Sequence, residues 1–193
     1  AAREALTDTR IAQPALGAIE GGLFHLLSSF GVQPDFVAGH SYGEYVALYA
    51  AGALNVEDFT RLSEARGRFI VEGVGEDPGA MAAVECNAAT VEELIGDIAG
   101  VGIANLNSPS QTIISGGRAA VKAAVAKLSA DGKRARQIPV ACAFHSPLMV
   151  PAQKPLAQFL SSLKLSTPQV PIFSNTTAAP YPKTPKAIAH LLV

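Results

Sequence analysis

Residues 36–44 read Phe36-Val37-Ala38-Gly39-His40-Ser41-Tyr42-Gly43-Glu44, and the chain is best understood from this segment. The apolar run 36–38 predicts a short buried strand of a parallel sheet, and residues 44–51 predict a helix that ends at Gly52. Between them stands Gly-x-Ser-x-Gly, a tight strand-to-helix turn that presents its serine at a helix N-terminus. We therefore predict that Ser41 is a nucleophile and that the backbone N–H of Tyr42 stabilises an oxyanion. A purely structural turn is the alternative.

The glycines that flank this motif, Gly39 and Gly43, indicate that the turn has no room for a side chain on either side of the nucleophile. Before the motif, apolar residues at helical spacing predict a helix over 14–30 with Pro14 in its first turn. After it, Asn55 is a good N-cap for a second helix that reaches residue 70. The apolar residues of the first helix are Leu16, Ile19, Leu23, Leu26, Leu27 and Phe30.

A different pattern occupies residues 79–140. Strand and helix signals follow one another there in the order βαββαβ, which is the ferredoxin-like pattern. Thr90 and Glu93 have the spacing of a capping box for its first helix. We predict that 79–140 is a small subdomain inserted into a larger α/β core made of 1–78 and 141–193.

Length and composition limit the classes of protein. The chain has 193 residues, of which 49% are hydrophobic and 16% charged, and this excludes a disordered chain. A formal net charge of −1 without a long basic run gives no support to nucleic-acid binding. No stretch is apolar enough for a membrane helix, and the N-terminus lacks the core of a signal peptide. Because Cys86 and Cys142 cannot build a disulfide framework, we expect the cytoplasm.

A serine nucleophile needs a base, and the chain offers four histidines. His25 lies within a predicted helix and His190 in the C-terminal segment, while His40 is adjacent to Ser41 and is predicted to pack or to line the pocket. His145 follows the last predicted strand of the inserted unit, and we predict that it is the general base. A histidine that only completes a turn is the alternative. Because no acidic residue stands close before it, a dyad is favoured over a triad, and no metal site is predicted.

Arg66 stands on the apolar face of the helix that begins at Asn55. A guanidinium on such a face needs an acceptor, because an unpaired buried charge costs several kcal/mol. The structural alternatives are an ion pair with Glu44 or Glu64 and a side chain that reaches to solvent. The functional alternative is a two-pronged partner for a substrate carboxylate. We expect the fold to bring Ser41, His145 and Arg66 around one hollow.

Together these motifs resemble the malonyl-CoA:acyl-carrier-protein transacylase family, most of all the acyltransferase domains of iterative type I polyketide synthases and polyunsaturated fatty acid synthases. The motifs occur in the family's order over nearly the whole chain. They are the segments 39–44, 66–67, 105–111, 115–116, 143–146 and 173–175.

The resemblance implies an α/β-hydrolase-like parallel-sheet core, incomplete here at both ends, with an inserted ferredoxin-like subdomain. It implies that Ser41 is acylated, that His145 is its base and that Arg66 binds the malonyl carboxylate. The resemblance also implies that Phe144 fills the space that a branched extender unit would need and that Asn175 lies near the substrate cleft. No cofactor is implied beyond the coenzyme A thioester that serves as substrate. The implied partners are malonyl-CoA and an acyl carrier protein, within a larger multidomain synthase of polyketide or fatty acid synthesis.

The sequence also departs from the family pattern. Tyr42 replaces the leucine, isoleucine or glutamine that is usual after the nucleophile and is expected to be a bulkier group beside the acyl pocket. Cys142 replaces the first histidine of a His-Ala-Phe-His signature. The family's opening strand and its Gly-Gln-Gly loop do not occur in the sequence. A serine esterase or thioesterase, and a catalytically silent domain of a synthase, are the alternative functions.

Overall fold

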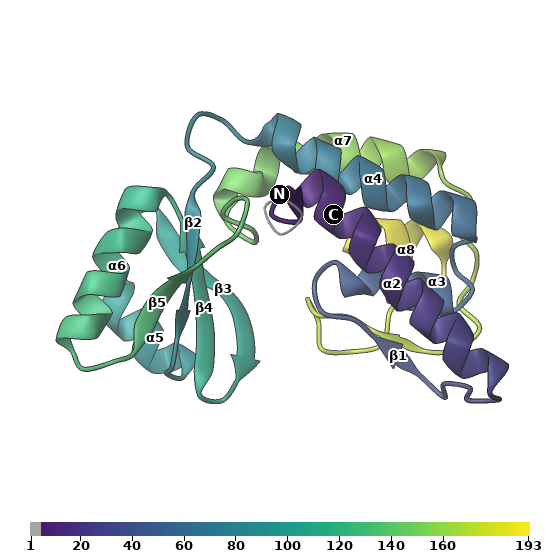
Figure 1. Ribbon diagram of the computed structural model, residues 1–193, viewed down its shortest axis with the longest axis horizontal. Helices are drawn as coiled ribbons and strands as arrows, with labels where there is room; N and C mark the ends of the chain where they lie inside the picture. Colours follow the sequence, from purple (N-terminus) through teal and green to yellow (C-terminus); the bar gives the residue numbers. More distant parts are fainter. Residues whose placement is uncertain (1–4) are drawn as a thin grey trace. The chain divides into compact units, whose positions relative to one another are not determined.

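The computed structural model describes residues 5–193 (Figure 1). The chain divides into two compact units, one formed by Ala1–Val71 with Gln153–Val193 and the other by Glu72–Ala152. Each unit has its own sheet and its own hydrophobic core. The predicted α/β class, with a parallel pair of strands and a separate antiparallel ferredoxin-like sheet, is confirmed. The predicted domain limits at 78/79 and 140/141 stay a prediction.

Helices dominate the first unit. Its core surrounds α3, whose residues 45–48 are buried against α4, α7 and α8. The strands β1 and β6 pair in parallel, with Val37 opposite Ile172 and Ala38 opposite Phe173. The elements are α2 (Thr9–Ser29), β1 (Val37–Ala38), α3 (Gly43–Ala50), α4 (Val56–Gly73), α7 (Val150–Ser162), β6 (Ile172–Phe173) and α8 (Pro185–Leu191).

The second unit is a four-stranded sheet with two helices. The strand order is β3-β4-β2-β5 and every neighbour is antiparallel, which is the strand order of a ferredoxin-like fold. Residues of α5 and α6 share one core with β2 and β4, so both helices cover the same face (Figure 1). The elements are β2 (Ala80–Val84), α5 (Ala88–Ile95), β3 (Val101–Ser108), β4 (Gln111–Gly116), α6 (Arg118–Ala130), β5 (Ala135–Ile138) and the 3-10 helix η1 (Pro147–Met149).

Two predicted helix starts are wrong. Helix α2 begins at Thr9 and holds Pro14 in its interior, because the side chain of Asp8 caps the helix by accepting from the N–H of Arg10 at 2.9 Å. Helix α5 begins at Ala88, because Asn87 accepts from the N–H of Thr90 and therefore takes the N-cap position that the sequence pattern assigned to Thr90.

The apolar stripe that predicts α2 is not the face that α2 buries. Its buried residues are small or polar: Thr9, Gln13, Gly17 and Gly21. The large apolar side chains lie outside, with Leu16 45% exposed and Phe30, at the C-cap, 76% exposed.

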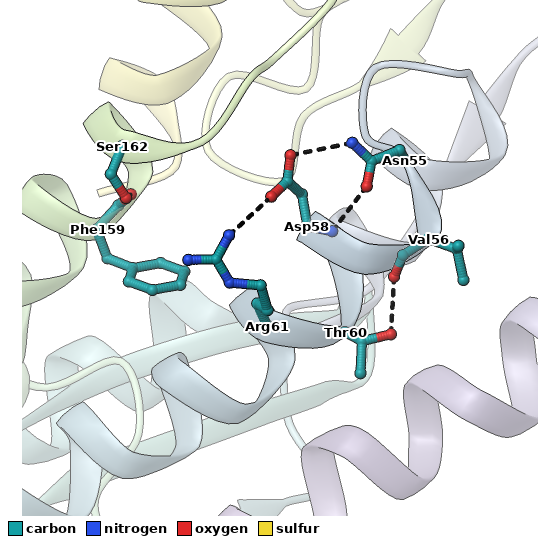
Figure 2. Close-up of polar contacts among 7 residues, drawn as sticks. All are labelled: Asn55, Val56, Asp58, Thr60, Arg61, Phe159 and Ser162. Carbon is teal, nitrogen blue, oxygen red and sulfur yellow. Dashed lines mark hydrogen bonds and ion pairs between the residues drawn. The ribbon is translucent and has the colours of Figure 1, made fainter.

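Helix α4 has the predicted N-cap. Asn55 Oδ1 accepts from the N–H of Asp58 at 2.8 Å, and its Nδ2 donates to the Asp58 carboxylate at 3.0 Å (Figure 2). Arg61 in the next turn pairs with Asp58 at 3.3 Å and places its guanidinium 5.7 Å from the centre of the Phe159 ring (Figure 2). These contacts join the start of α4 to α7. None of the helices within residues 5–193 has the length and apolar character that a membrane span needs.

Candidate active site

Ser41 lies in the tight turn between β1 and α3. Its φ is 53°, in the left-handed region that residues other than glycine rarely adopt and that costs about 1–3 kcal/mol. Two backbone hydrogen bonds between residues three apart in the sequence close the turn. Gly43 N–H donates to the His40 carbonyl at 2.9 Å, and Glu44 N–H donates to the Ser41 carbonyl at 3.1 Å. This is the strained strand-to-helix geometry that holds a nucleophilic serine.

The two flanking glycines are not equivalent. A Cβ on Gly39 would lie 2.0 Å from the backbone of Gly43 and 2.6 Å from the nitrogen of Glu44, so no side chain fits there. Apart from its chain neighbours and the backbone of its own helix, a Cβ on Gly43 would meet no atom of the described residues within 4 Å. The prediction that both positions exclude a side chain is therefore correct for Gly39 and wrong for Gly43, since only Gly39 faces the returning backbone.

Tyr42 has a backbone and a side chain with separate tasks. Among the hydrogen bonds of the described residues, none uses its backbone N–H, so this donor is available to an oxyanion. Its side chain is buried in the core, where its hydroxyl bonds Ser63 of α4 at 2.7 Å. Burial raises the pKa of this phenol, so it stays protonated. The hydroxyl lies between Ser63 of α4 and Gly17 of α2, and the expectation that Tyr42 stands beside the acyl pocket stays a prediction.

Asn175 binds the backbone of the same turn. Its Oδ1 accepts from the N–H of Ser41 at 2.7 Å, and its Nδ2 donates to the carbonyl of Gly39 at 2.8 Å. The backbone N–H of Asn175 donates to Glu44 Oε1 at 2.8 Å, and the Tyr181 hydroxyl donates to the same oxygen at 3.0 Å.

Arg66 lies on α4 against the first turn of α3. Its guanidinium carbon is 5.5 Å from the centre of the Tyr45 ring, and Tyr45 lies about one helical turn beyond Ser41. Its Nη1 donates to Gln13 Oε1 at 2.9 Å. The alternative of an ion pair between Arg66 and Glu44 or Glu64 is wrong. Glu44 accepts hydrogen bonds from Asn175 and Tyr181. Glu64 forms an ion pair with Arg68.

His145 and Phe144 belong to the second unit. His145 has a φ of 58° and is exposed, and the turn around it is held by the Ser146 hydroxyl, which donates to the Ala143 carbonyl at 2.7 Å. Ser146 also caps the 3-10 helix η1 that follows. Phe144 is half-buried, and His40, in the first unit, is exposed. The pairing of His145 with Ser41 and the roles of Phe144 and His40 stay predictions.

Several contacts of the first unit were not expected from the sequence. They are the bonds of Asn175 and Tyr181 to the serine turn, of Ser63 to Tyr42 and of Gln13 to Arg66. Each joins residues from different elements, and no local pattern marks either partner. Within residues 5–193, no group of three or more His, Cys, Asp or Glu side chains is arranged to hold a metal ion.

The chain is similar to known proteins over almost its whole length. The family model described as an acyl transferase domain matches residues 1–190. Mycoketide-CoA synthase from Mycobacterium tuberculosis is 43% identical over 172 residues, which are 89% of this chain and 4% of that protein. Malonyl CoA-acyl carrier protein transacylase from Bacillus subtilis is 39% identical over 181 residues, 91% of this chain and 57% of that protein.

A solved structure is similar over almost the whole chain. The malonyl CoA-acyl carrier protein transacylase from Coxiella burnetii superposes with a TM-score of 0.93 at 37% identity. The superposition covers 98% of this chain and 61% of the Coxiella chain. The chain therefore spans less than two thirds of the length of these relatives.

Proposed function

Since the chain belongs to the acyl transferase domain family, we propose that it moves a malonyl group from coenzyme A to the phosphopantetheine thiol of an acyl carrier protein. The observation that carries this proposal is the placing of Arg66 against the first turn of α3, the helix that follows the strained Ser41. The first unit therefore places the hydroxyl of Ser41 at the start of α3 and the guanidinium of Arg66 beside the first turn of the same helix, where it could bind the malonyl carboxylate. The names of the two transacylase relatives are consistent with this substrate pair.

The proposed reaction has two half-reactions that use Ser41 in turn. His145 takes the hydroxyl proton, the Ser41 Oγ bonds to the thioester carbon, and the bond from that carbon to the coenzyme A sulfur breaks. The proton passes from His145 to the leaving sulfur. The carrier protein's thiol then gives its proton to His145, attacks the malonyl-serine carbon and releases the Ser41 hydroxyl, which regains the proton. The Tyr42 N–H donates to the oxyanion in both steps.

Arg66 supplies selection among acyl groups in this proposal. A charge-assisted, bidentate pair between a guanidinium and a carboxylate contributes about 1.5–3 kcal/mol. Malonyl carries the required carboxylate and acetyl does not. We assign Phe144 and His40 to the wall of the substrate pocket, where Phe144 would exclude a branched extender unit. No cofactor besides the coenzyme A thioester is needed for these steps.

We further propose that the chain works within a larger synthase of polyketide or fatty acid synthesis, as the mycobacterial relative's 4% coverage suggests. Its two cysteine side chains, Cys86 and Cys142, form no disulfide in the described part of the chain, which suits the reducing cytoplasm where we place it.

The test is a mass spectrum of the intact protein after mixing with malonyl-CoA. We expect one malonyl adduct on Ser41 in the wild type and none in Ser41→Ala. His145→Ala should form the adduct about 100-fold or more slowly, since general-base catalysis contributes about 10²–10⁴-fold. Addition of holo acyl carrier protein should move the malonyl group to its thiol. If water hydrolyses the adduct at the same rate with or without a thiol acceptor, the protein is an esterase. If no adduct forms at all, the domain is catalytically silent.

A further inference from the structure

The parallel ladder between β1 and β6 ends at Ala38, three residues before the nucleophile. Its last pair is Ala38 with Phe173, and the same register continued for two more residues would place Asn175 opposite His40. In a parallel sheet, a residue bonds through its N–H and its carbonyl to the two residues that flank its partner. The flanking residues here are Gly39 and Ser41.

The side-chain amide of Asn175 makes this pair of bonds in place of its backbone. Nδ2 donates to the Gly39 carbonyl at 2.8 Å, and Oδ1 accepts from the Ser41 N–H at 2.7 Å. A primary amide has the same donor and acceptor as a peptide group. The ladder is thus continued by one rung, which binds Gly39, two residues before the nucleophile, and the nucleophile itself.

A carboxylate and a phenol orient this amide. The Asn175 backbone N–H turns away from the ladder and donates to Glu44 Oε1 at 2.8 Å. Glu44 stands in the first turn of α3, where the helix dipole favours a negative charge. Tyr181, itself only 7% exposed, donates to the same oxygen at 3.0 Å. Burial first, and Glu44 second, raise the pKa of Tyr181 well above its usual range, so its hydroxyl remains a donor.

We infer that Asn175, oriented by Glu44 and Tyr181, is a positioning residue that holds Ser41 in its left-handed conformation for acyl transfer. Asn175 acts through the backbone of Ser41 and not by contact with the acyl group, which differs from the substrate contact that the family resemblance implies. The left-handed backbone is unfavourable for serine, and the two bonds of the rung, to the Gly39 carbonyl and to the Ser41 N–H, offset this cost. The inference rests on the proposed function, because it concerns how the same serine reacts.

The experiment measures the rate of Ser41 acylation by malonyl-CoA in the intact protein. Asn175→Ala removes the whole rung, and Asn175→Asp keeps the acceptor but lacks the N–H that reaches Gly39. We expect both rates to fall about 10- to 100-fold, as a displacement of about 1 Å at a reacting group does. The KM for malonyl-CoA should change less than about threefold, because the rung is not expected to touch substrate.

Variants of the two orienting residues refine the test. Glu44→Gln keeps an oxygen that accepts from Asn175 and Tyr181 and should stay within about threefold of the wild type, whereas Glu44→Ala should resemble Asn175→Ala. Tyr181→Phe removes one of the two donors to Glu44 and should give an intermediate rate. Asn55→Ala is the matched control: it removes two hydrogen bonds of an asparagine in the same unit, so it should lower the melting temperature and leave the rate unchanged (Figure 2).

A fluorophosphonate separates this inference from the proposed function. It reacts with a positioned serine hydroxyl by forming an Oγ–P bond and expelling fluoride, and it needs no malonyl recognition. If the wild type is labelled by the fluorophosphonate but not by malonyl-CoA, the proposed substrate is wrong and the labelling rates of the variants still test the rung. If the fluorophosphonate labels Asn175→Ala and Asn175→Asp at the wild-type rate, the inference is overturned. If neither malonyl-CoA nor the fluorophosphonate labels the wild type, both the proposed function and this inference are overturned.

Discussion

Arg66 Nη1 lies 2.9 Å from Gln13 Oε1, so a neutral side chain of α2 holds the guanidinium of α4. Gln13 is buried and is held in turn by a bond from its Nε2 to Thr9 Oγ1 at 2.6 Å. No ion pair among residues 5–193 includes Arg66. The cation is therefore oriented without being neutralised, which suits the proposed role of Arg66 in binding the malonyl carboxylate.

Replacement of Arg66 by alanine should remove the preference for malonyl. We expect the rate of Ser41 acylation from malonyl-CoA to fall about 10- to 100-fold, which corresponds to the loss of one charge-assisted pair. Acylation from acetyl-CoA should change less than about threefold, because acetyl has no carboxylate. The measurement is the acyl-enzyme yield against time for malonyl-, methylmalonyl- and acetyl-CoA. An unchanged malonyl preference would show that Arg66 is not the carboxylate partner.

Gln13→Glu tests whether the neutrality of the Arg66 partner matters. The substitution keeps the size of the side chain and places a carboxylate against the guanidinium, so it competes with the malonyl carboxylate. We expect malonyl acylation to fall about 10-fold and acetyl acylation to be retained, since hydrogen bonds between charged groups contribute about 1.5–3 kcal/mol. The same mass-spectrometric assay measures both. Equal losses for malonyl and acetyl would indicate damage to the fold instead.

The two glycines of the serine turn should respond differently to alanine. Gly39→Ala places a methyl group 2.0 Å from the Gly43 backbone, so the turn cannot close and labelling of Ser41 should be lost. Gly43→Ala meets no atom within 4 Å outside its chain neighbours and the backbone of its own helix, among the described residues, and should be labelled within about threefold of the wild type. Fluorophosphonate labelling and the melting temperature of both variants check this. Equal behaviour of the two variants would contradict the geometry.

Position 17 has no room for a side chain larger than hydrogen, because the Tyr42 hydroxyl lies against it. A Cβ at Gly17 would lie 2.2 Å from that oxygen and 3.0 Å from Phe59, so Gly17→Ala should destabilise the protein by about 1–3 kcal/mol through overpacking. Tyr42→Phe removes the oxygen, and in the double variant much of the Gly17→Ala cost should disappear. Urea unfolding of the two single variants and the double variant gives this coupling energy. Strictly additive losses would show that the two residues are independent.

Asp77 should make part of the stability of the second unit depend on pH. The backbone N–H groups of Gly79 and Arg118 donate to its carboxylate and lower its pKa below the ordinary 3.8. A lowered folded-state pKa means that the stabilisation is complete above about pH 4 and is lost as the pH falls through the folded-state value. The stability advantage of the wild type over Asp77→Asn should therefore shrink in acid.

Urea unfolding at a series of pH values from 7 to 3 measures this advantage. Glu76→Gln, at the exposed neighbouring position, controls for the loss of one negative charge. A wild-type advantage that stays constant over the whole pH range would contradict the role of Asp77.

Much of the framework can be predicted because its signals are local. The turn around Ser41 depends on residues within one strand end and one helix start, and Asn55 caps α4 through bonds that reach only three residues. The βαββαβ order also follows from short patterns that repeat along residues 79–140. Local patterns also left errors at helix starts: Asn87 takes the cap of α5 in place of Thr90, and Asp8 caps α2 so that it starts at Thr9, five residues before Pro14.

Contacts between distant segments could not be predicted in this way. The amide of Asn175 meets Ser41 across 134 residues, and the sequence has no signal for the register of β6 that brings them together. The apolar stripe of α2 correctly predicted a helix but not its buried face, which is set by the close approach of Tyr42 and Phe59 at Gly17. Residue patterns specify the conformation of a segment, because that depends on neighbours in the chain. The partners of each side chain depend on how whole elements pack, and only the folded chain defines that.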